Sequence, residues 1–521
     1  MPLQLLKYKP GVVKDITEYA AGKNGPYWVD SDLVRFKNGY PEKLGGWQKD
    51  VIYGLNPSGN ATSVETSIEG IARRMIYWRA ASDGEDRLAI GTDNHLFILL
   101  NGLLYDITPL RKTSAGLSNP IATTNESTTV TITDASHGAE TGDWVVLSGT
   151  TATGGIAADT LNDYYGYQLT VIDGNSYSIV VPTAATSTVA AGGGTVEIKY
   201  LIGNSAGLGA QSAVPALGWG VGGWGQGTWN TARVATTPDI ALDNSSWNLS
   251  LWGEDLIATV RGGAIYYWDI SAGVSSRAVL VSSLAGAESV PTEARVTTVS
   301  FPDRHFIAGG CTAYNSAEVD DMLVRWSSQE EFTKFAPTAT NTAGDQRLEV
   351  GTKIVAMVAA REETIISTDE AVYGMTFVGG DFVFSFRLLA TDSGAAGLNT
   401  MIGIDGDVYW LGKRNFFRYD GIVKELPCSV QYYVFDRMQE NFIEKATVGH
   451  NKAFKEVTWF YVSNDNPAGT INPEPDSYVT YNYAEDAWTV GTMDRTVWSD
   501  SFGARKVPFA FDPDGHLYEH E

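Results

Sequence analysis

A short unit recurs along this sequence and restricts the folds that the chain can adopt. Each copy has an apolar strand, a tight turn of Asp, Gly or Asn, and a second strand led by an aromatic residue. Strands separated by such turns are typical of antiparallel β-hairpins. Five copies are clear, at residues 87–98, 256–268, 364–374, 408–420 and 508–518.

The spacing of these units favours a β-propeller. The turns at Asp369 and Arg414 lie 45 residues apart, and one four-stranded blade occupies roughly 40–50 residues. A propeller closes its blades into a ring, so that each sheet covers the face of its neighbour. We therefore predict an all-β fold with a propeller-like core of about six or seven blades. A pair of packed β-sandwiches would give similar strand statistics and is the alternative.

The predicted propeller is interrupted by an insertion. Residues 1–120 would hold an N-terminal segment and the first blade or blades, and residues 236–521 the remaining blades. Between them, residues 121–202 are rich in Thr, Ser and Ala and have their own strand pattern, which predicts a small β-barrel or β-sandwich. Inserts lie outside a scaffold, so this domain is a candidate docking site for a fibre or another partner.

Residues 203–235 form a segment rich in Gly and Trp. A formal G-x-G-x-x-G pattern starts at Gly220, but the strand and helix that flank this motif in a dinucleotide site are missing. We interpret the segment as a Gly-hinged loop. Large rigid aromatic residues serve as interface anchors. The loop displays three candidates for a subunit contact or a gate, Trp219, Trp224 and Trp229.

One helix is predicted, over residues 429–445. Apolar side chains at helical spacing would form a single stripe along it, at Tyr432, Phe435, Met438 and Phe442. This stripe would pack against the sheets or against a neighbouring subunit.

Composition excludes several classes of protein. Two cysteines, Cys311 and Cys428, are too few for a disulfide framework or a thiolate metal site. The net charge of −24 argues against the basic face of an ordinary nucleic-acid binder. An acidic wall would instead let DNA pass without holding it, although charge for solubility explains the same excess. No stretch approaches the roughly 20 apolar residues that cross a bilayer.

The sequence lacks a recognisable catalytic, cofactor or metal site. The pairs Asp320-Asp321 and Glu362-Glu363 would point to opposite faces of a strand. The six histidines lack zinc-site spacing. Residues 512–515 begin like a calcium loop but fit a hairpin turn better. We predict a protein that is not an enzyme and that needs no cofactor or metal.

The segment at 34–47 reads VRFKNGYPEKLGGW. It predicts a strand, an Asn-Gly turn, a second strand and a Gly-Gly bend. This phrase resembles the opening of the packaged-DNA stabilisation proteins, also called tail hub or tail nozzle proteins, of short-tailed bacteriophages. Residues 218–229 and 408–435 are also similar to that family. The residues that would anchor the N-terminus are Arg35, Phe36, Asn38, Gly39 and Trp47.

The resemblance implies a structural protein of the phage tail in the virion, made in the cytoplasm of the bacterial host. Six copies would form a ring below the portal and its adaptor protein. The ring would retain the packaged genome and conduct double-stranded DNA during ejection, and a tail fibre or tailspike would dock outside it. The alternative is a receptor-binding or polysaccharide-degrading tail propeller protein.

Overall fold

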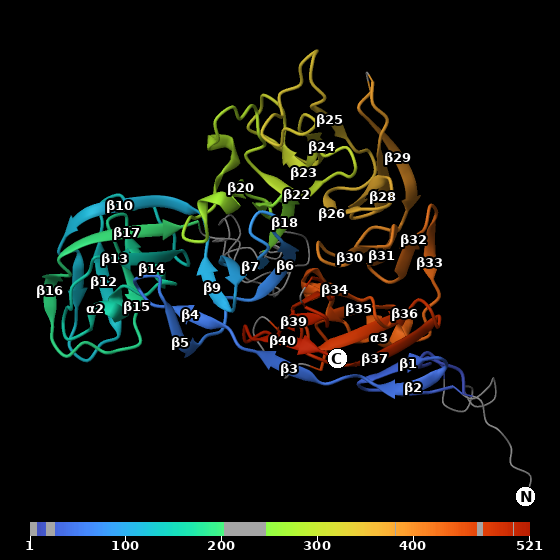
Figure 1. Ribbon diagram of the computed structural model, residues 1–521, viewed down its shortest axis with the longest axis horizontal. Helices are drawn as coiled ribbons and strands as arrows, with labels where there is room; N and C mark the ends of the chain where they lie inside the picture. The colour runs from blue at the N-terminus through green and yellow to red at the C-terminus, as the bar shows by residue number, and fades with distance from the viewer. Residues whose placement is uncertain (1–7, 17–26, 203–245, 381, 466–472, 504) are drawn as a thin grey trace, which may run out of the picture.

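The chain folds into a β-propeller that carries an inserted β-domain. The computed structural model describes residues 8–16, 27–202, 246–380, 382–465, 473–503 and 505–521. Seven β-sheets, here called blades 1–7, surround a common centre (Figure 1). The predicted fold class, all-β with a propeller core, an inserted small β-domain and few helices, is confirmed.

The strand named first here for each blade is the innermost strand, and the other strands lie progressively further from the centre of the ring. Blade 1 contains β6 (Ala72–Arg79), β7 (Asp86–Thr92), β8 (Leu96–Leu100) and β9 (Leu103–Asp106), with β4 (Tyr53–Leu55) and β5 (Ala61–Glu65) added at its outer edge. Blade 2 contains β18 (Trp247–Trp252), β19 (Asp255–Val260), β20 (Ile265–Trp268) and β21 (Val279–Leu280). Blade 3 contains β22 (Ala294–Val299), β23 (Phe306–Thr312), β24 (Val319–Trp326) and β25 (Gly344–Arg347).

The other four blades repeat this plan. Blade 4 contains β26 (Ile354–Ala359), β27 (Glu363–Thr368), β28 (Ala371–Phe377) and β29 (Phe384–Thr391). Blade 5 contains β30 (Met401–Ile404), β31 (Asp407–Leu411), β32 (Phe416–Tyr419) and β33 (Val423–Leu426). Blade 6 contains β34 (Thr447–Asn451), β35 (Glu456–Tyr461), β36 (Ser477–Asn482) and β37 (Ala487–Thr492). Blade 7 contains β38 (Val497–Ser499), β39 (Phe509–Phe511), β40 (Leu517–His520) and β3 (Trp47–Asp50).

The ring is closed by strands from opposite ends of the sequence. Each inner strand contacts the inner strands of the two neighbouring blades, and β38 of blade 7 contacts β6 of blade 1. The outermost strand of blade 7 is β3, which pairs antiparallel with β40, so that Trp47 lies opposite His520 and Asp50 opposite Leu517. Blade 7 therefore cannot be completed without the N-terminal segment.

Neighbouring blades pack closely where a glycine of one blade faces a tryptophan of the next. A Cβ atom on Gly91 in blade 1 would lie 2.7 Å from the Cβ of Trp247 in blade 2. A Cβ atom on Gly449 in blade 6 would lie 2.4 Å from the ring of Trp498 in blade 7. These positions accept only glycine without displacement of a large, well-packed side chain.

The inserted domain projects from one side of the ring (Figure 1). Its apolar core is separate from those of the blades. A single helical turn, α2 (Ala158–Leu161), accompanies eight strands. The strands are β10 (Leu110–Ser118), β11 (Ile121–Thr123), β12 (Thr129–Thr133), β13 (Trp144–Ser148), β14 (Tyr167–Asp173), β15 (Ser176–Val180), β16 (Val189–Gly192) and β17 (Thr195–Leu201).

Aromatic side chains fix the inserted domain on blade 1. The ring of Trp144 meets the buried ring of His95 edge-on, with centroids 4.7 Å apart. The hydroxyl of Tyr165 donates a hydrogen bond to the Leu104 carbonyl oxygen at 3.0 Å. Burial lowers the pKa of His95 to about 4, so this imidazole packs as a neutral ring at physiological pH. The contacts give the domain a defined orientation on the propeller.

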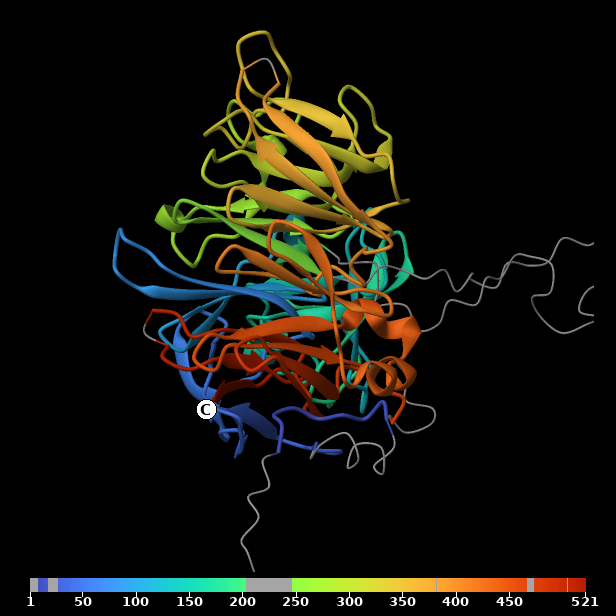
Figure 2. The ribbon, with the colours of Figure 1, turned by 90° about the vertical axis from the view of Figure 1, so that its right-hand side faces the viewer.

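The predicted helix over 429–445 is interrupted. Helix α3 (Gln431–Arg437) stops at Met438, which is extended (φ −71°, ψ 132°), and a 3-10 helix, η3 (Glu440–Lys445), follows. The break arises because Met438 pairs as an isolated β-bridge with Ser463 of blade 6, and Gln439 N–H donates to the Val462 carbonyl oxygen. Both segments lie on one face of the ring (Figure 2). Among the described residues, no helix has the length and apolar character needed to cross a membrane.

We expect Gly91→Ala and Gly449→Ala each to lower the free energy of unfolding by about 1–3 kcal/mol, because the new methyl group must displace a packed tryptophan. Urea denaturation measures the change. The matched control is Gly174→Ala, whose added Cβ would meet nothing within 4 Å. Equal denaturation midpoints for all three variants would contradict the close packing between blades.

Candidate functional site

The N-terminal motif forms a hairpin against blade 6. Strands β1 (Val34–Lys37) and β2 (Tyr40–Lys43) pair across a turn in which Asn38 (φ 52°) and Gly39 (φ 79°) are both left-handed. Two left-handed residues make the turn that best suits a two-residue hairpin. Phe36 is buried in the core shared by blades 5 and 6.

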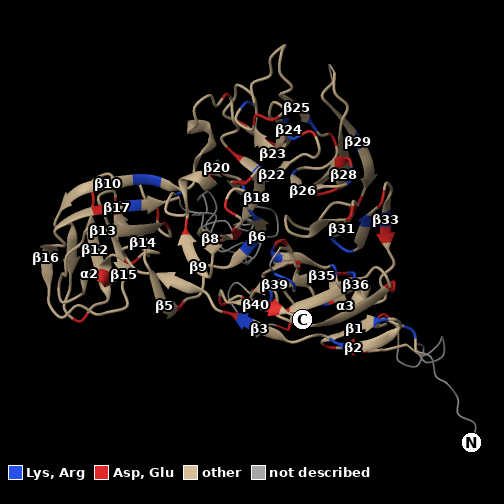
Figure 3. Ribbon diagram, viewed as in Figure 1, with Lys and Arg blue, Asp and Glu red and all other residues tan. Residues whose placement is uncertain are grey.

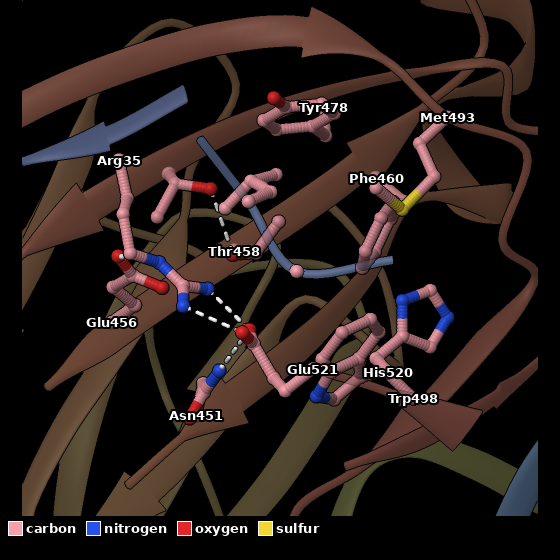
Figure 4. A pocket seen from close by; sticks show the side chains of 13 residues that line it. Arg35, Asn451, Glu456, Thr458, Phe460, Tyr478, Met493, Trp498, His520 and Glu521 are labelled. Atoms are coloured by element: carbon pink, nitrogen blue, oxygen red, sulfur yellow. Dashed lines mark hydrogen bonds and ion pairs between the residues drawn. The ribbon is translucent and has the colours of Figure 1, made fainter. Parts of the chain in front are cut away.

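Arg35 joins this hairpin to the last blades through two carboxylates (Figure 4). Both terminal nitrogens of its guanidinium donate to the Glu521 carboxylate, with Nη1 2.6 Å from Oε2. Its Nε lies 3.2 Å from Oε1 of Glu456. Asn451 Nδ2 also donates to Glu521, at 3.0 Å. A cavity of about 40 Å³ beside them is lined by Thr458, Phe460, Tyr478, Trp498 and His520, among others.

Burial changes the acid–base behaviour of this pocket. Desolvation, with a smaller contribution from the charge of Glu521, raises the pKa of Glu456 to about 7 against the opposing charge of Arg35. Burial and the charge of Arg495 lower the pKa of His520 to about 3. The pocket therefore holds a carboxyl group that titrates near neutral pH beside a histidine that stays neutral.

A second group of charges, here called the axial cluster, consists of two carboxylates that each bind two cations. Glu474 Oε2 lies 2.5 Å from Arg73 Nη1, and Glu474 Oε1 lies 2.7 Å from Lys445 Nζ. Glu444 Oε2 lies 2.5 Å from Arg261 Nη2, and Glu444 Oε1 lies 3.4 Å from Lys353 Nζ. The members are Arg73, Arg261, Lys353, Glu444, Lys445 and Glu474.

The members of the axial cluster come from all around the ring. Arg73 belongs to blade 1, Arg261 follows β19 of blade 2, Lys353 precedes β26 of blade 4, and Glu474 precedes β36 of blade 6. Side chains from opposite sides of a propeller can meet only near its axis. The 3-10 helix η3 supplies Glu444 and Lys445 and so lies close to the propeller axis.

The axial carboxylates are held as anions. Burial favours protonation, but the charges of Arg261 and Lys353 keep the pKa of Glu444 below its ordinary value. Arg73 and Lys445 do the same for Glu474. A general acid needs a raised pKa, and a nucleophilic carboxylate needs a free oxygen near substrate. Both carboxylates are instead committed to ion pairs that join residues of different blades.

Three of the four residues in the adjacent acidic pairs Asp320-Asp321 and Glu362-Glu363 contact different partners. Asp320 binds Arg347 at 2.8 Å, whereas Asp321 lies 3.4 Å from Arg295. Glu363 accepts a hydrogen bond from the Tyr419 hydroxyl.

The three candidate tryptophans, Trp219, Trp224 and Trp229, lie outside the described residues.

The turn between β39 and β40 brings three possible metal ligands together. Ligand atoms of Asp512, Asp514 and His516 lie within 4.8 Å of one another. Asp512 already accepts hydrogen bonds from His516 N–H at 2.8 Å and from the His516 ring, and these bonds shape the turn.

Comparison with known proteins leaves the family open. No family model and no curated protein matches the sequence. Among solved structures, the phage phi92 endosialidase is 10% identical (TM-score 0.23), over 92% of this chain and 65% of that chain. The designed Ika8 protein is 11% identical (TM-score 0.33; 87% and 98%). Apo AztD from Citrobacter koseri is 10% identical (TM-score 0.32; 82% and 88%). At these values no property of the three proteins transfers to this chain.

The axial cluster predicts a strong dependence of stability on its carboxylates. Replacing Glu474 by Gln leaves Arg73 and Lys445 buried without their counter-charge, and we expect the free energy of unfolding to fall by about 3 kcal/mol or more. The control is Glu440→Gln, whose side chain is 81% exposed. Guanidinium denaturation of both variants measures the difference, and equal stability would contradict the burial of Arg73 and Lys445 in ion pairs with Glu474.

The Arg35 pocket predicts a pH effect with a defined sign. The pKa of Glu456 is about 7 in the folded protein, above its ordinary value of 4.5, so the folded state binds this proton more tightly. The resulting stabilisation is complete below the ordinary pKa and is lost as pH rises through about 7. Glu456→Gln removes this loss.

We therefore expect the melting temperature of Glu456→Gln, relative to the unmodified chain, to rise between about pH 5 and about pH 8. Differential scanning calorimetry across this range provides the measurement. The exposed Glu425→Gln serves as a control and should show a constant difference. A constant difference for Glu456→Gln as well would refute the raised pKa.

Proposed function

We propose that this chain is a ring-forming subunit of a bacteriophage tail nozzle, with six copies around the DNA path. The observation that carries the proposal is the phrase at residues 34–47. The resemblance lies in the residues that build the N-terminal hairpin and begin β3. A segment that closes the propeller has a structural reason to keep a specific sequence.

The charge of the inserted domain supports its proposed role as a docking site. From residue 113 to residue 198 the sequence has no Lys or Arg but eight Asp and Glu residues. Lys and Arg of this domain are confined to β10 and β17 (Figure 3). Such a surface would attract a partner with a basic face, and we assign this role to the tail fibre or tailspike.

The axial cluster bears on the DNA path. Because ion pairs made by Glu444 and Lys445 lie at the propeller axis, we place the DNA path outside the propeller of each subunit. In the proposed ring, double-stranded DNA therefore passes through the central opening that the six subunits surround. The net charge of −24 per chain disfavours tight binding of phosphates. We propose that the protein retains and conducts the genome without catalysis, below the portal and adaptor.

The mass and symmetry of the purified assembly test this proposal. Native mass spectrometry should give six times the mass of one 56.3 kDa chain. Two-dimensional class averages from electron microscopy should show sixfold rings with a central opening. If the chain forms rings only with its adaptor, the same measurement on the mixture should show them.

A trimer or a monomer, alone and with the adaptor, would overturn the nozzle proposal. A trimer would favour the alternative of a receptor-binding or polysaccharide-degrading tail protein. A screen for hydrolysis of host surface polysaccharides would then separate these two activities.

A further inference from the structure

Two neighbouring cavities lie on the face of the propeller that carries α3. One has a volume of about 250 Å³ and the other about 280 Å³. Both are lined by Lys413, Arg414 and Asn415, which form the turn between β31 and β32 of blade 5. These three residues, here called the ridge, therefore line both cavities, and the two adjoining cavities are together called the groove.

The interruption of the predicted helix creates the first cavity. Because the chain turns at Met438, α3 and η3 enclose a hollow with apolar side chains from Phe435, Met438 and Ile443. The lining also includes polar side chains with both donors and acceptors. These are Lys413, Arg414, Asn415, Gln431, Tyr432, Asp436 and Glu440.

Several polar groups in the groove are free to bind a ligand. Tyr432 is 70% exposed, and its ring has no aromatic partner among the described residues. The carboxylates of Glu370 and Asp392, in the second cavity, make no ion pair or hydrogen bond within the described part of the chain. The Lys413 ammonium likewise has no carboxylate within ion-pair distance there.

The charges of the groove disfavour anions and long polycations. In the first cavity the two cations, Lys413 and Arg414, are balanced by Asp436 and Glu440. The second cavity adds Asp369, Glu370 and Asp392, which would repel an anionic ligand. A polycation would have to cross the ridge of Lys413 and Arg414. Neutral ligands with many hydroxyl groups meet neither barrier, since hydroxyls both donate and accept.

We propose that this groove binds a neutral oligosaccharide. One sugar ring lies with its apolar C–H face on Tyr432 and Phe435. Gln431 Nε2 already donates to Asn415 Oδ1 and to the Arg414 carbonyl oxygen, so the sugar hydroxyls bond to Asn415 Nδ2, Gln431 Oε1 and the Asp436 carboxylate. The following sugars cross the ridge and bond to Glu370 and Asp392. Pockets with an apolar floor and a few polar groups that fix orientation are typical of ligand sites. Binding here is a property of one chain and does not depend on the nozzle proposal.

Isothermal titration calorimetry on the intact chain tests this site. The probes are the neutral hexasaccharides of α1,4-linked glucose, of mannose and of N-acetylglucosamine, with an α2,8-linked sialic acid hexamer as the anionic comparison. We expect at least one neutral probe to bind and the sialic acid hexamer not to bind. Tyr432→Ala should weaken the binding by about tenfold or more.

The matched control is Tyr40→Ala, which removes a tyrosine that is 75% exposed on the N-terminal hairpin. It should leave sugar binding unchanged. The proposal is overturned if none of the neutral probes binds, if the anionic hexamer binds equally well, or if Tyr432→Ala binds as tightly as Tyr40→Ala. Since assembly is measured separately, failure here leaves the sixfold ring untouched.

Discussion

Pairing between β3 and β40 completes the last of the seven blades in the ring. Without it, blade 7 would end in the exposed edge of β40. The N-terminal hairpin strengthens this pairing because Arg35 binds both Glu456 of blade 6 and Glu521, the residue after β40. The same short segment thus completes one blade and joins it to its neighbour.

A closed ring also brings side chains from distant parts of the sequence together at its axis. The axial cluster solves this problem with charges rather than apolar residues, because η3 brings Glu444 and Lys445 to a place where arginines from blades 1 and 2 already converge. Buried ion pairs contribute little net stability, but they tolerate few alternative arrangements. The arrangement of the axial cluster is consequently specific, even where the net contribution of its ion pairs to stability is small.

Local features of the fold were predictable from the sequence, and long-range ones were not. The strand–turn units and their 45-residue spacing indicated a propeller, and the Asn38-Gly39 pair indicated a hairpin turn. The axial cluster gave no signal, since Arg73 and Glu474 are 401 residues apart. The break at Met438 was missed because helical periodicity cannot show that blade 6 competes for backbone hydrogen bonds. Because this break creates the groove beside α3, no sequence pattern predicts the groove either.

The long separation in sequence between β3 and β40 affects how the chain folds during its synthesis. Strand β3 leaves the ribosome long before its partner β40, because Asp50 and Leu517 are 467 residues apart in the sequence (517 − 50). At roughly 5–20 residues per second, β3 waits for roughly half a minute to a minute and a half with its hydrogen-bonding edges unpaired. During that interval the blades already synthesised can pack, but the ring stays open. Premature strand pairing between two nascent chains is therefore the characteristic error that this topology must avoid.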